Sequence, residues 1–347
     1  YIFLIFWIYL IINSLINNFN LDSLKISLFY FRYGVFVVAI ANLLLFDNKF
    51  IKYLFYCILF CFTALILDGF IEYFAGENIL GWSNNESSRI ASFFGEEKIL
   101  GSYLSRLWPI FFGISIFLFK QKEKLFYLIV VIFILSEALI FLSGDRAAFF
   151  NINLSAIFVI LFSKKLLKLR VITLFASIFL IIIISFINPT AKERIFDQTI
   201  KQMIGAEERS HGETGIFIFT KTHTHHYITA YKMYLDNKLL GVGVKNFRIF
   251  CSNEKYEVSN LSCSTHPHNT YIQILSETGV IGFLFLLLTL IYFCKYILKH
   301  LLLRFKGIQL FSDFEICILS GIAIYLWPII PTGNIFSNWL NIIMILN

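Results

Sequence analysis

Long apolar runs, separated by short polar loops, dominate the hydrophobic pattern of this chain. Several runs reach the roughly 20 residues that an α-helix needs to cross the hydrocarbon core of a membrane. Because lipid offers no hydrogen-bond partner to an open backbone, the pattern predicts an all-α, polytopic bundle of transmembrane helices. We count ten apolar spans, centred near residues 7, 37, 60, 110, 133, 155, 179, 285, 320 and 342.

The first and last spans are incomplete, since the chain begins at Tyr1 inside one apolar run and ends at Asn347 inside another. We therefore expect residues 1–347 to form a single membrane domain, truncated at both ends, of a protein with about 11 or 12 spans. Composition agrees, because 58% of the residues are hydrophobic and only 15% are charged. The net charge of +7 lies mostly in short loops and requires no nucleic-acid partner.

Basic residues gather in the loops after spans four, six and eight, and they predict the orientation. They are Lys120, Lys122 and Lys124, then Lys164, Lys165, Lys168 and Arg170, then Lys295, Lys299, Arg304 and Lys306. Since Lys and Arg accumulate on the cytoplasmic side, this face is predicted to be cytoplasmic. Segments 70–101 and 188–275 then form a small and a large outer loop, and the large loop is long enough to carry function.

Residues 225–240 of the large loop have a helical pattern that ends before Gly241. Ile228, Tyr231, Met233 and Leu235 fall near helical spacing. The pattern predicts a short amphipathic helix on the membrane surface. We interpret its aromatic stripe as a packing face in preference to a platform for sugar rings.

Six of the seven histidines lie in the large loop, and His266-Pro267-His268 is the strongest local signal. Pro267 prevents a helix from running through the two histidines, and Thr270 with Gln273 resembles a capping box that starts one directly afterwards. A helix N-terminus favours an anion and a neutral imidazole, which suits a general base beside a phosphate. The alternative is that both histidines only hydrogen-bond the loop together.

Three arginines of the outer segments are candidates for binding phosphate. Arg89 precedes span four, Arg146 lies in the tight turn between spans five and six, and Arg248 lies in the large loop. Guanidinium groups bind a diphosphate bidentately, although a single interfacial arginine also serves to contact lipid head groups. Within spans four and five, Arg106 and Glu137 are expected to form a structural ion pair. Asp145 is a candidate partner of Arg146.

Two further groups of side chains, a cysteine pair and a set of histidines, have alternative interpretations. Cys251 and Cys263 lie in the outer loop, where an oxidising compartment favours a disulfide, and two free thiols are the alternative. The zinc alternative rests on five histidines, but their spacing matches no standard motif and they have no Cys or Glu partners, so no metal and no other cofactor is expected. These histidines are His223, His225, His226, His266 and His268.

Taken together, residues 68–339 resemble the O-antigen ligase and O-antigen polymerase superfamily. The resemblance rests on the order and spacing of several short motifs. These are Arg89 to Gly95 with Gly101-Ser-Tyr103, Ser143-Gly-Asp-Arg146, His226-Tyr, Gly241-Val-Gly243, Asn246-Phe-Arg248, Cys263-Ser-Thr-His-Pro-His-Asn269, Glu277-Thr-Gly279, Trp327-Pro328, Thr332-Gly-Asn and Asn338-Trp339.

The resemblance implies a metal-independent, inverting glycosyltransferase of the bacterial inner membrane, with its active site facing the periplasm. Its donor would be a glycan on undecaprenyl diphosphate, and its acceptor hydroxyl would belong to lipid A core in a ligase or to a second lipid-linked glycan in a polymerase. Arg89, Arg146 and Arg248 would bind the diphosphate. His268 would be the base, with His266 supporting it or exchanging roles.

Several residues have open supporting roles in this scheme. His223, His226, Lys245 and Glu277 are possible supporting residues. Many ligase-like relatives carry an arginine about 18 residues before the equivalent of Gly241, where this chain has His223 or its neighbours. Arg248 or Lys221 substitutes for that arginine, or the histidine pair holds the phosphate itself.

Two other function classes remain open from the sequence. One is a non-enzymatic transporter of the same lipid-linked sugar, and the other is a zinc-dependent membrane hydrolase. The transferase hypothesis requires the arginines of separate membrane turns to meet the imidazole of His268 on the outer side of the membrane.

Overall fold

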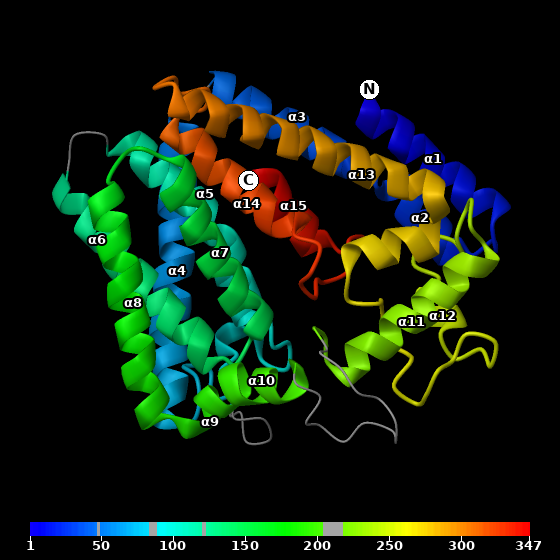
Figure 1. The fold of residues 1–347 in the computed structure, drawn as a ribbon, viewed down its shortest axis with the longest axis horizontal. Coiled ribbons are helices and arrows are strands. Elements are labelled where there is room, and N and C mark those ends of the chain that lie inside the picture. The colour runs from blue at the N-terminus through cyan, green and yellow to red at the C-terminus, as the bar shows by residue number, and fades with distance from the viewer. Residues whose placement is uncertain (47–48, 83–88, 120–122, 204–217) are drawn as a thin grey trace. The chain divides into compact units, whose positions relative to one another are not determined.

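A computed structural model describes residues 1–46, 49–82, 89–119, 123–203 and 218–347 (Figure 1). Lys120, Lys122 and His211 lie outside these described residues. Contacts within the chain divide it into two compact units. Unit 1 comprises Tyr1–Asn42, Gln202–Lys299 and Leu326–Ile345, and unit 2 comprises Leu43–Lys201, His300–Tyr325 and Leu346–Asn347. That the chain forms one membrane domain stays a prediction.

The described residues are helical and contain no strand. The first part of the chain has α1 (Ile2–Ile16), α2 (Leu21–Phe29), α3 (Phe31–Phe46), α4 (Phe50–Ala75), η1 (Ser92–Phe94), α5 (Leu100–Leu118), α6 (Glu123–Leu142), α7 (Arg146–Phe162) and α8 (Leu167–Ile187). The second part has α9 (Pro189–Lys192), η2 (Glu193–Asp197), α10 (Gln198–Met203), α11 (Lys221–Asp236), α12 (Phe247–Phe250), α13 (Thr270–Phe305), α14 (Asp313–Leu326) and α15 (Asn338–Leu346). Every predicted span centre falls inside one of these helices.

The protein is a multi-pass membrane protein by the length and hydropathy of its helices. Five described helical stretches are long and apolar enough to span a membrane: Leu21–Phe46, Phe50–Ala75, Leu100–Leu118, Leu167–Ile187 and Thr270–Phe305. Ile2–Ile16, Phe126–Leu142 and Arg146–Phe162 are shorter apolar helices. The count of ten spans and the orientation therefore stay predictions. Helix α4 ends at Ala75 and α5 begins at Leu100, so the predicted small outer loop 70–101 overlaps the ends of both helices, and its position outside the membrane stays a prediction.

Unit 2 is built from α4 to α8, which pack on one another with aromatic side chains between them. Phe62 stacks on Phe111, and Trp108 lies 4.7 Å from Phe133 between ring centroids. The expected ion pair between Arg106 and Glu137 is wrong, because Arg106 turns back to the Ser102 side chain and carbonyl and lies over the Tyr325 ring. The Nε of Arg106 and both carboxylate oxygens of Glu137 have no hydrogen-bond partner among the described residues.

Unit 1 depends on a close backbone contact between α13 and the loop after α11. Gly279 interrupts α13 with φ 64° and ψ −169°, and a Cβ there would lie 2.2 Å from the Leu239 carbonyl oxygen. A Cβ on Gly241 would lie 2.5 Å from the Ser276 oxygen. The N–H groups of Val242 and Gly243 donate to the carbonyls of Ser276 and Glu277. The segments around Gly241 and Gly279 therefore form the two sides of one tight backbone contact that only glycine allows.

The predicted amphipathic helix is α11, and its four predicted apolar positions do not share one environment. Ile228, Tyr231 and Leu235 are exposed, whereas Met233 is buried together with His226, Thr229 and Ala230. Ala230 and Met233 pack in a core with Val242, Phe247 and Tyr256. That the exposed apolar side lies on a membrane surface stays a prediction.

Candidate functional site

An arginine cluster surrounds the turn that joins α6 to α7 in unit 2. The Nε of Arg89 donates to the Ser143 carbonyl at 3.0 Å, and the Nε of Arg194 donates to the Gly144 carbonyl at 3.2 Å. Arg146 begins α7 directly after this turn and reaches Thr199. The structure therefore brings two of the predicted arginines, Arg89 and Arg146, to one turn and adds Arg194.

Local backbone geometry builds this turn. Gly144 has φ 65°, and a Cβ on it would lie 2.5 Å from the Arg194 side chain, so the close approach requires glycine. Asp145 caps α7, its carboxylate accepting from the Ala148 N–H at 3.0 Å. Asp145 is therefore tied to the helix N-terminus, as well as contributing negative charge close to Arg89.

Two buried carboxylates of α4 fix the segment that carries Arg89. Glu72 accepts hydrogen bonds from the backbone N–H groups of Ala91 and Ser92, and Asp68 accepts from the Ser92 hydroxyl and the Ile79 N–H. Both carboxylates are almost fully buried. Arg89 therefore leaves a backbone anchored two residues away, which limits the positions that its guanidinium reaches.

The arginines of this cluster repel one another. Burial lowers the pKa of Arg89 from its ordinary value, and repulsion from Arg194 and Arg146 lowers it further, while Asp145 opposes the change. An oxyanion at this turn would relieve the repulsion and gain charge-assisted hydrogen bonds from more than one guanidinium. Sequence reasoning missed Arg194, although a basic residue close behind span seven, on the predicted outer side, was a usable signal.

A second cluster, of four imidazoles, lies in unit 1. The ring centroid of His268 lies 4.1 Å from that of His266, 5.4 Å from that of His226 and 5.3 Å from that of His223. His266 and His268 come from the loop before α13, whereas His223 and His226 come from α11. The structure thus brings together both predicted catalytic histidines and both predicted supporting histidines.

The loop that carries His266 and His268 is held by the segment before α15. The Thr332 N–H donates to the His268 carbonyl at 2.8 Å, and the Nε2 of His266 donates to the Thr332 carbonyl at 3.2 Å. His268 has φ 56°, a left-handed conformation that is unusual for a residue with a side chain. Sequence reasoning did not include Thr332 among the site residues.

Helix α13 starts at Thr270, as the sequence predicts, but the capping residue is different. The Asn269 side chain accepts from the N–H groups of Tyr271 and Ile272, and its amide donates to the Pro328 carbonyl. Gln273 instead bonds the side chains of Glu277 and Asn334. The predicted capping box is therefore wrong, because an asparagine one residue earlier caps the helix.

The imidazoles of this cluster favour the neutral form. Burial lowers the pKa of His266 to about 3, and repulsion from His268 adds to the effect. Burial also lowers the pKa of His268 to about 4, with a contribution from His226. Since a carbonyl only accepts, the Nε2 of His266 carries its proton, and its Nδ1 accepts from the Thr265 hydroxyl.

The Nε2 of His268 already contacts a hydroxyl group. It lies 3.0 Å from the Ser264 oxygen, and no carbonyl is bonded to this nitrogen among the described residues. In the tautomer with the proton on Nδ1, Nε2 accepts a hydrogen bond from a hydroxyl. His268 is therefore the member of the pair that is able to take a proton from an alcohol at this position.

His226 and Tyr227 complete the wall of the histidine cluster. His226 is 3% exposed, burial lowers its pKa, and its Nδ1 has no hydrogen-bond partner in the described part of the chain. The Tyr227 hydroxyl donates to the His268 carbonyl at 3.4 Å. No group of three or more His, Cys, Asp or Glu residues among those described has an arrangement that would hold a metal ion.

Arg248, Lys245 and Glu277 lie around the loop that supports the cluster. Arg248 donates to the Thr265 carbonyl at 3.0 Å, next to His266, and it is exposed. Glu277 is fully buried and accepts from the Phe247 N–H and the Gln273 amide, so it braces the loop from inside. Burial and the nearby Arg248 lower the pKa of Lys245.

A disulfide ties down the chain before the histidine loop. The structure joins Cys251 to Cys263, the pairing expected from the sequence, with Cα atoms 5.0 Å apart. Cys263 lies three residues before His266, and Cys251 is buried in the core of unit 1. The bridge therefore anchors the histidine loop to the core beneath α11.

The predicted site residues are divided between the two units. Arg89 and Arg146 belong to unit 2, whereas Arg248 and the histidines belong to unit 1. Their convergence stays a prediction. Residues 128–287, which include Arg146, Arg194, Arg248 and all four clustered histidines, match the protein family described as O-antigen ligase. No curated protein matches the chain.

Proposed function

Because residues 128–287 form a domain of the O-antigen ligase family, we propose that this protein transfers a glycan from undecaprenyl diphosphate to an acceptor hydroxyl at the periplasmic face of the bacterial inner membrane. The family match indicates a ligase- or polymerase-like glycosyltransferase. The donor, the acceptor and the sidedness belong to the proposal. The observation that carries it is a partly buried His268, which favours the neutral form and whose Nε2 already lies within hydrogen-bond distance of a hydroxyl.

In this proposal the arginine cluster binds the diphosphate of the donor. Arg89, Arg146 and Arg194 offer several N–H donors, and Gly144 lets the backbone lie close beneath them. A diphosphate is a good leaving group once its growing charge is stabilised, so fixed guanidinium groups contribute more than a proton donor would. Arg248 assists from α12, where it donates to the Thr265 carbonyl of the histidine loop.

The acceptor hydroxyl is the weak partner, and His268 activates it. Its neutral Nε2 takes the hydroxyl proton while the acceptor oxygen forms a bond to the anomeric carbon of the donor sugar. The bond from that carbon to the diphosphate oxygen breaks, and the diphosphate leaves with the electron pair. A single displacement of this kind inverts the anomeric configuration. His266 fixes the loop through Thr332 and Thr265, so it is a positioning residue for His268.

The acceptor decides between a ligase and a polymerase, and the described residues favour neither. Lipid A core is the acceptor in the first case, and another lipid-linked glycan is the acceptor in the second. Deletion of the gene distinguishes them. Loss of all surface glycan indicates ligation, whereas capping by a single repeat indicates polymerisation.

The decisive experiment measures transfer in proteoliposomes that contain the full-length protein, the lipid-linked glycan of the source cells and the acceptor. His268→Gln should lower turnover by about 10²-fold or more, the usual contribution of a general base. His225→Gln is the matched control, because His225 lies on the same helix as His226 and bonds Ser259 instead of joining the cluster.

Two further results separate the alternatives. Arg194→Gln should raise the KM for the donor more than it lowers kcat, since binding of the diphosphate is weakened. Unchanged turnover in His268→Gln would remove the mechanism. Donor translocation without any transfer by the intact protein would identify a transporter, and loss of transfer on chelation would support the zinc hypothesis.

A further inference from the structure

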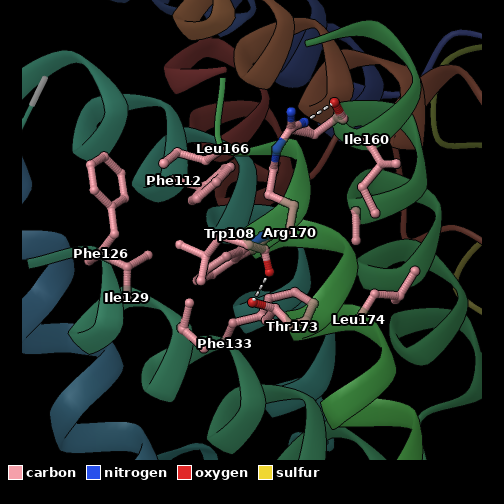
Figure 2. A pocket seen from close by; sticks show the side chains of 14 residues that line it. Trp108, Phe112, Phe126, Ile129, Phe133, Ile160, Leu166, Arg170, Thr173 and Leu174 are labelled. Atoms are coloured by element: carbon pink, nitrogen blue, oxygen red, sulfur yellow. Dashed lines mark hydrogen bonds between the residues drawn. The ribbon is translucent and has the colours of Figure 1, made fainter. Parts of the chain in front are cut away.

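An apolar cavity lies within unit 2, among α5, α6, α7 and α8 (Figure 2). The space between its lining side chains, open mouth included, is about 520 Å³, of which about 50 Å³ admits the centres of water-sized molecules, so the cavity has room for part of a hydrocarbon chain. Its wall is almost entirely aliphatic and aromatic. The lining residues on which the argument depends are Trp108, Phe126, Phe133, Ala156 and Arg170.

Arg170 is the charged group of the wall. It is 8% exposed, and its terminal N–H groups donate to the carbonyls of Val159 and Ser163. Its Nε is buried and has no hydrogen-bond partner among the described residues. A buried guanidinium with an unused donor is costly in apolar surroundings unless an anion or a polar group reaches it.

More positive charge lies next to Arg170, at the end of the helices that is predicted to be cytoplasmic. Lys164 and Lys165 are exposed in the link between α7 and α8, and Lys168 is exposed in the first turn of α8. The carboxylate of Asp313 also lies here, and it accepts from the Ser163 hydroxyl and the Lys164 N–H. Among the described residues, an anion at this end of the cavity therefore meets Arg170 and three lysines against the one charge of Asp313.

This cavity is separate from the arginine cluster. Helix α7 begins at Arg146, which belongs to that cluster, and it ends at Phe162, next to the lysine-rich link. Its 17 residues correspond to about 25 Å at the rise of an α-helix. Arg170 therefore has no part in holding the donor diphosphate as proposed above, and its role is independent of that proposal.

We propose that this cavity holds part of one acyl chain of an anionic glycerophospholipid from the cytoplasmic leaflet, with its phosphate among Arg170 and the three lysines. Because the bilayer is as apolar as the cavity, transfer of the acyl chain from the bilayer to the cavity gains little free energy. Selectivity must come from the head group, and basic pockets between transmembrane helices bind anionic head groups. We therefore expect the site to distinguish lipids by the charge of the head group and hardly by the length of the acyl chain.

The test uses Trp108, which lines the cavity, as the reporter in nanodiscs of the full-length protein. The probes are phosphatidylglycerol and phosphatidylcholine with identical brominated chains, and Trp108→Phe identifies the Trp108 share of the fluorescence. We expect half-maximal quenching of the Trp108 fluorescence with either lipid at a different mole fraction. The mole fraction needed should be about tenfold lower for brominated phosphatidylglycerol than for brominated phosphatidylcholine. Equal quenching by the two lipids would overturn the proposal.

Two variants test the cavity and the charge separately. Ala156→Phe fills the cavity and should abolish the saturable quenching, whereas Ile157→Phe, at a position 45% exposed and outside the lining, should retain it. Substitution of Lys164, Lys165 and Lys168 by Gln leaves the cavity intact and should remove the preference for phosphatidylglycerol. This variant decides the matter if Ala156→Phe does not fold.

One outcome would reassign the occupant. In this outcome undecaprenyl phosphate relieves the quenching, whereas unbrominated phosphatidylglycerol does not. It would show that the cavity binds a polyprenyl tail and would overturn the phospholipid proposal. Relief by unbrominated phosphatidylglycerol alone is the expected result.

Discussion

The buried histidine cluster should make both stability and activity respond to acid in a way that ordinary histidines do not. The pKa is lowered from 6.5 to about 3 for His266 and to about 4 for His268. In the unfolded chain both rings have an ordinary pKa near 6.5, so between these values the unfolded state binds more protons than the folded state. Stability is therefore fully present above about pH 6.5 and is lost as the pH falls toward the folded pKa values.

The size of the effect follows from the same values. At pH 5 the unfolded state gains about 2 kcal/mol for each imidazole by taking up a proton, and the folded state gains almost nothing. The two rings together should lower the free energy of unfolding by about 4 kcal/mol between pH 8 and pH 5. His266→Gln and His268→Gln should each remove about half of this difference, whereas His225→Gln should leave it intact.

Activity should follow a different curve from stability. If His268 is the base, kcat/KM of the folded enzyme reports its pKa in the free enzyme, so the acid limb should lie near pH 4 instead of pH 6.5. The measurements are unfolding in detergent, transfer in proteoliposomes and ¹⁵N shifts of the imidazoles, all between pH 4.5 and 8. A free energy of unfolding that is equal at pH 5 and pH 8, or imidazoles that titrate near 6.5, would refute the reasoning.

Two further predictions concern the supports of the cluster. Gly279→Ala should lower the free energy of unfolding by about 3 kcal/mol or more, since glycine alone adopts this backbone region and the Cβ would strike the Leu239 carbonyl. Gly76→Ala, with φ 83° and open space around it, should cost only about 1 kcal/mol, and equal losses in thermal unfolding would contradict the clash. Replacing Cys251 and Cys263 by Ser should lower the free energy of unfolding by about 3 kcal/mol. Identical unfolding of the wild-type protein with and without reductant would contradict a stabilising disulfide.

The helices could be predicted from the sequence because lipid imposes a simple rule on the chain. A run of about 20 apolar residues has to be helical, so each predicted span centre falls in a helix. The start of α13 at Thr270 was also readable, because Pro267 excludes helix before it. The N-cap residue of α13 could not be predicted in the same way, because Asn269 and Thr270 are both acceptable capping residues.

The packing around the site could not be read in the same way. Hydropathy selected Ile228, Tyr231, Met233 and Leu235 in α11, and of these only Met233 is buried. The buried face of α11 also includes His226, which lies in the imidazole cluster, and no periodic pattern encodes such a partner. Arg194 and Thr332 were missed for a related reason, because each acts through a segment that is distant in sequence.

The histidine loop shows why its motifs are spread so widely along the chain. A base must be fixed to a fraction of an ångström, and a loop cannot do this alone because its backbone has few contacts of its own. Thr332 holds its carbonyl side, the disulfide to Cys251 holds its beginning, and α13 holds its end through Asn269. The kink at Gly279 then locks α13 to the loop after α11. All of these contacts fix the position of the His268 imidazole. Substitutions at sites far apart in the sequence should therefore affect one step, the removal of the acceptor proton by His268.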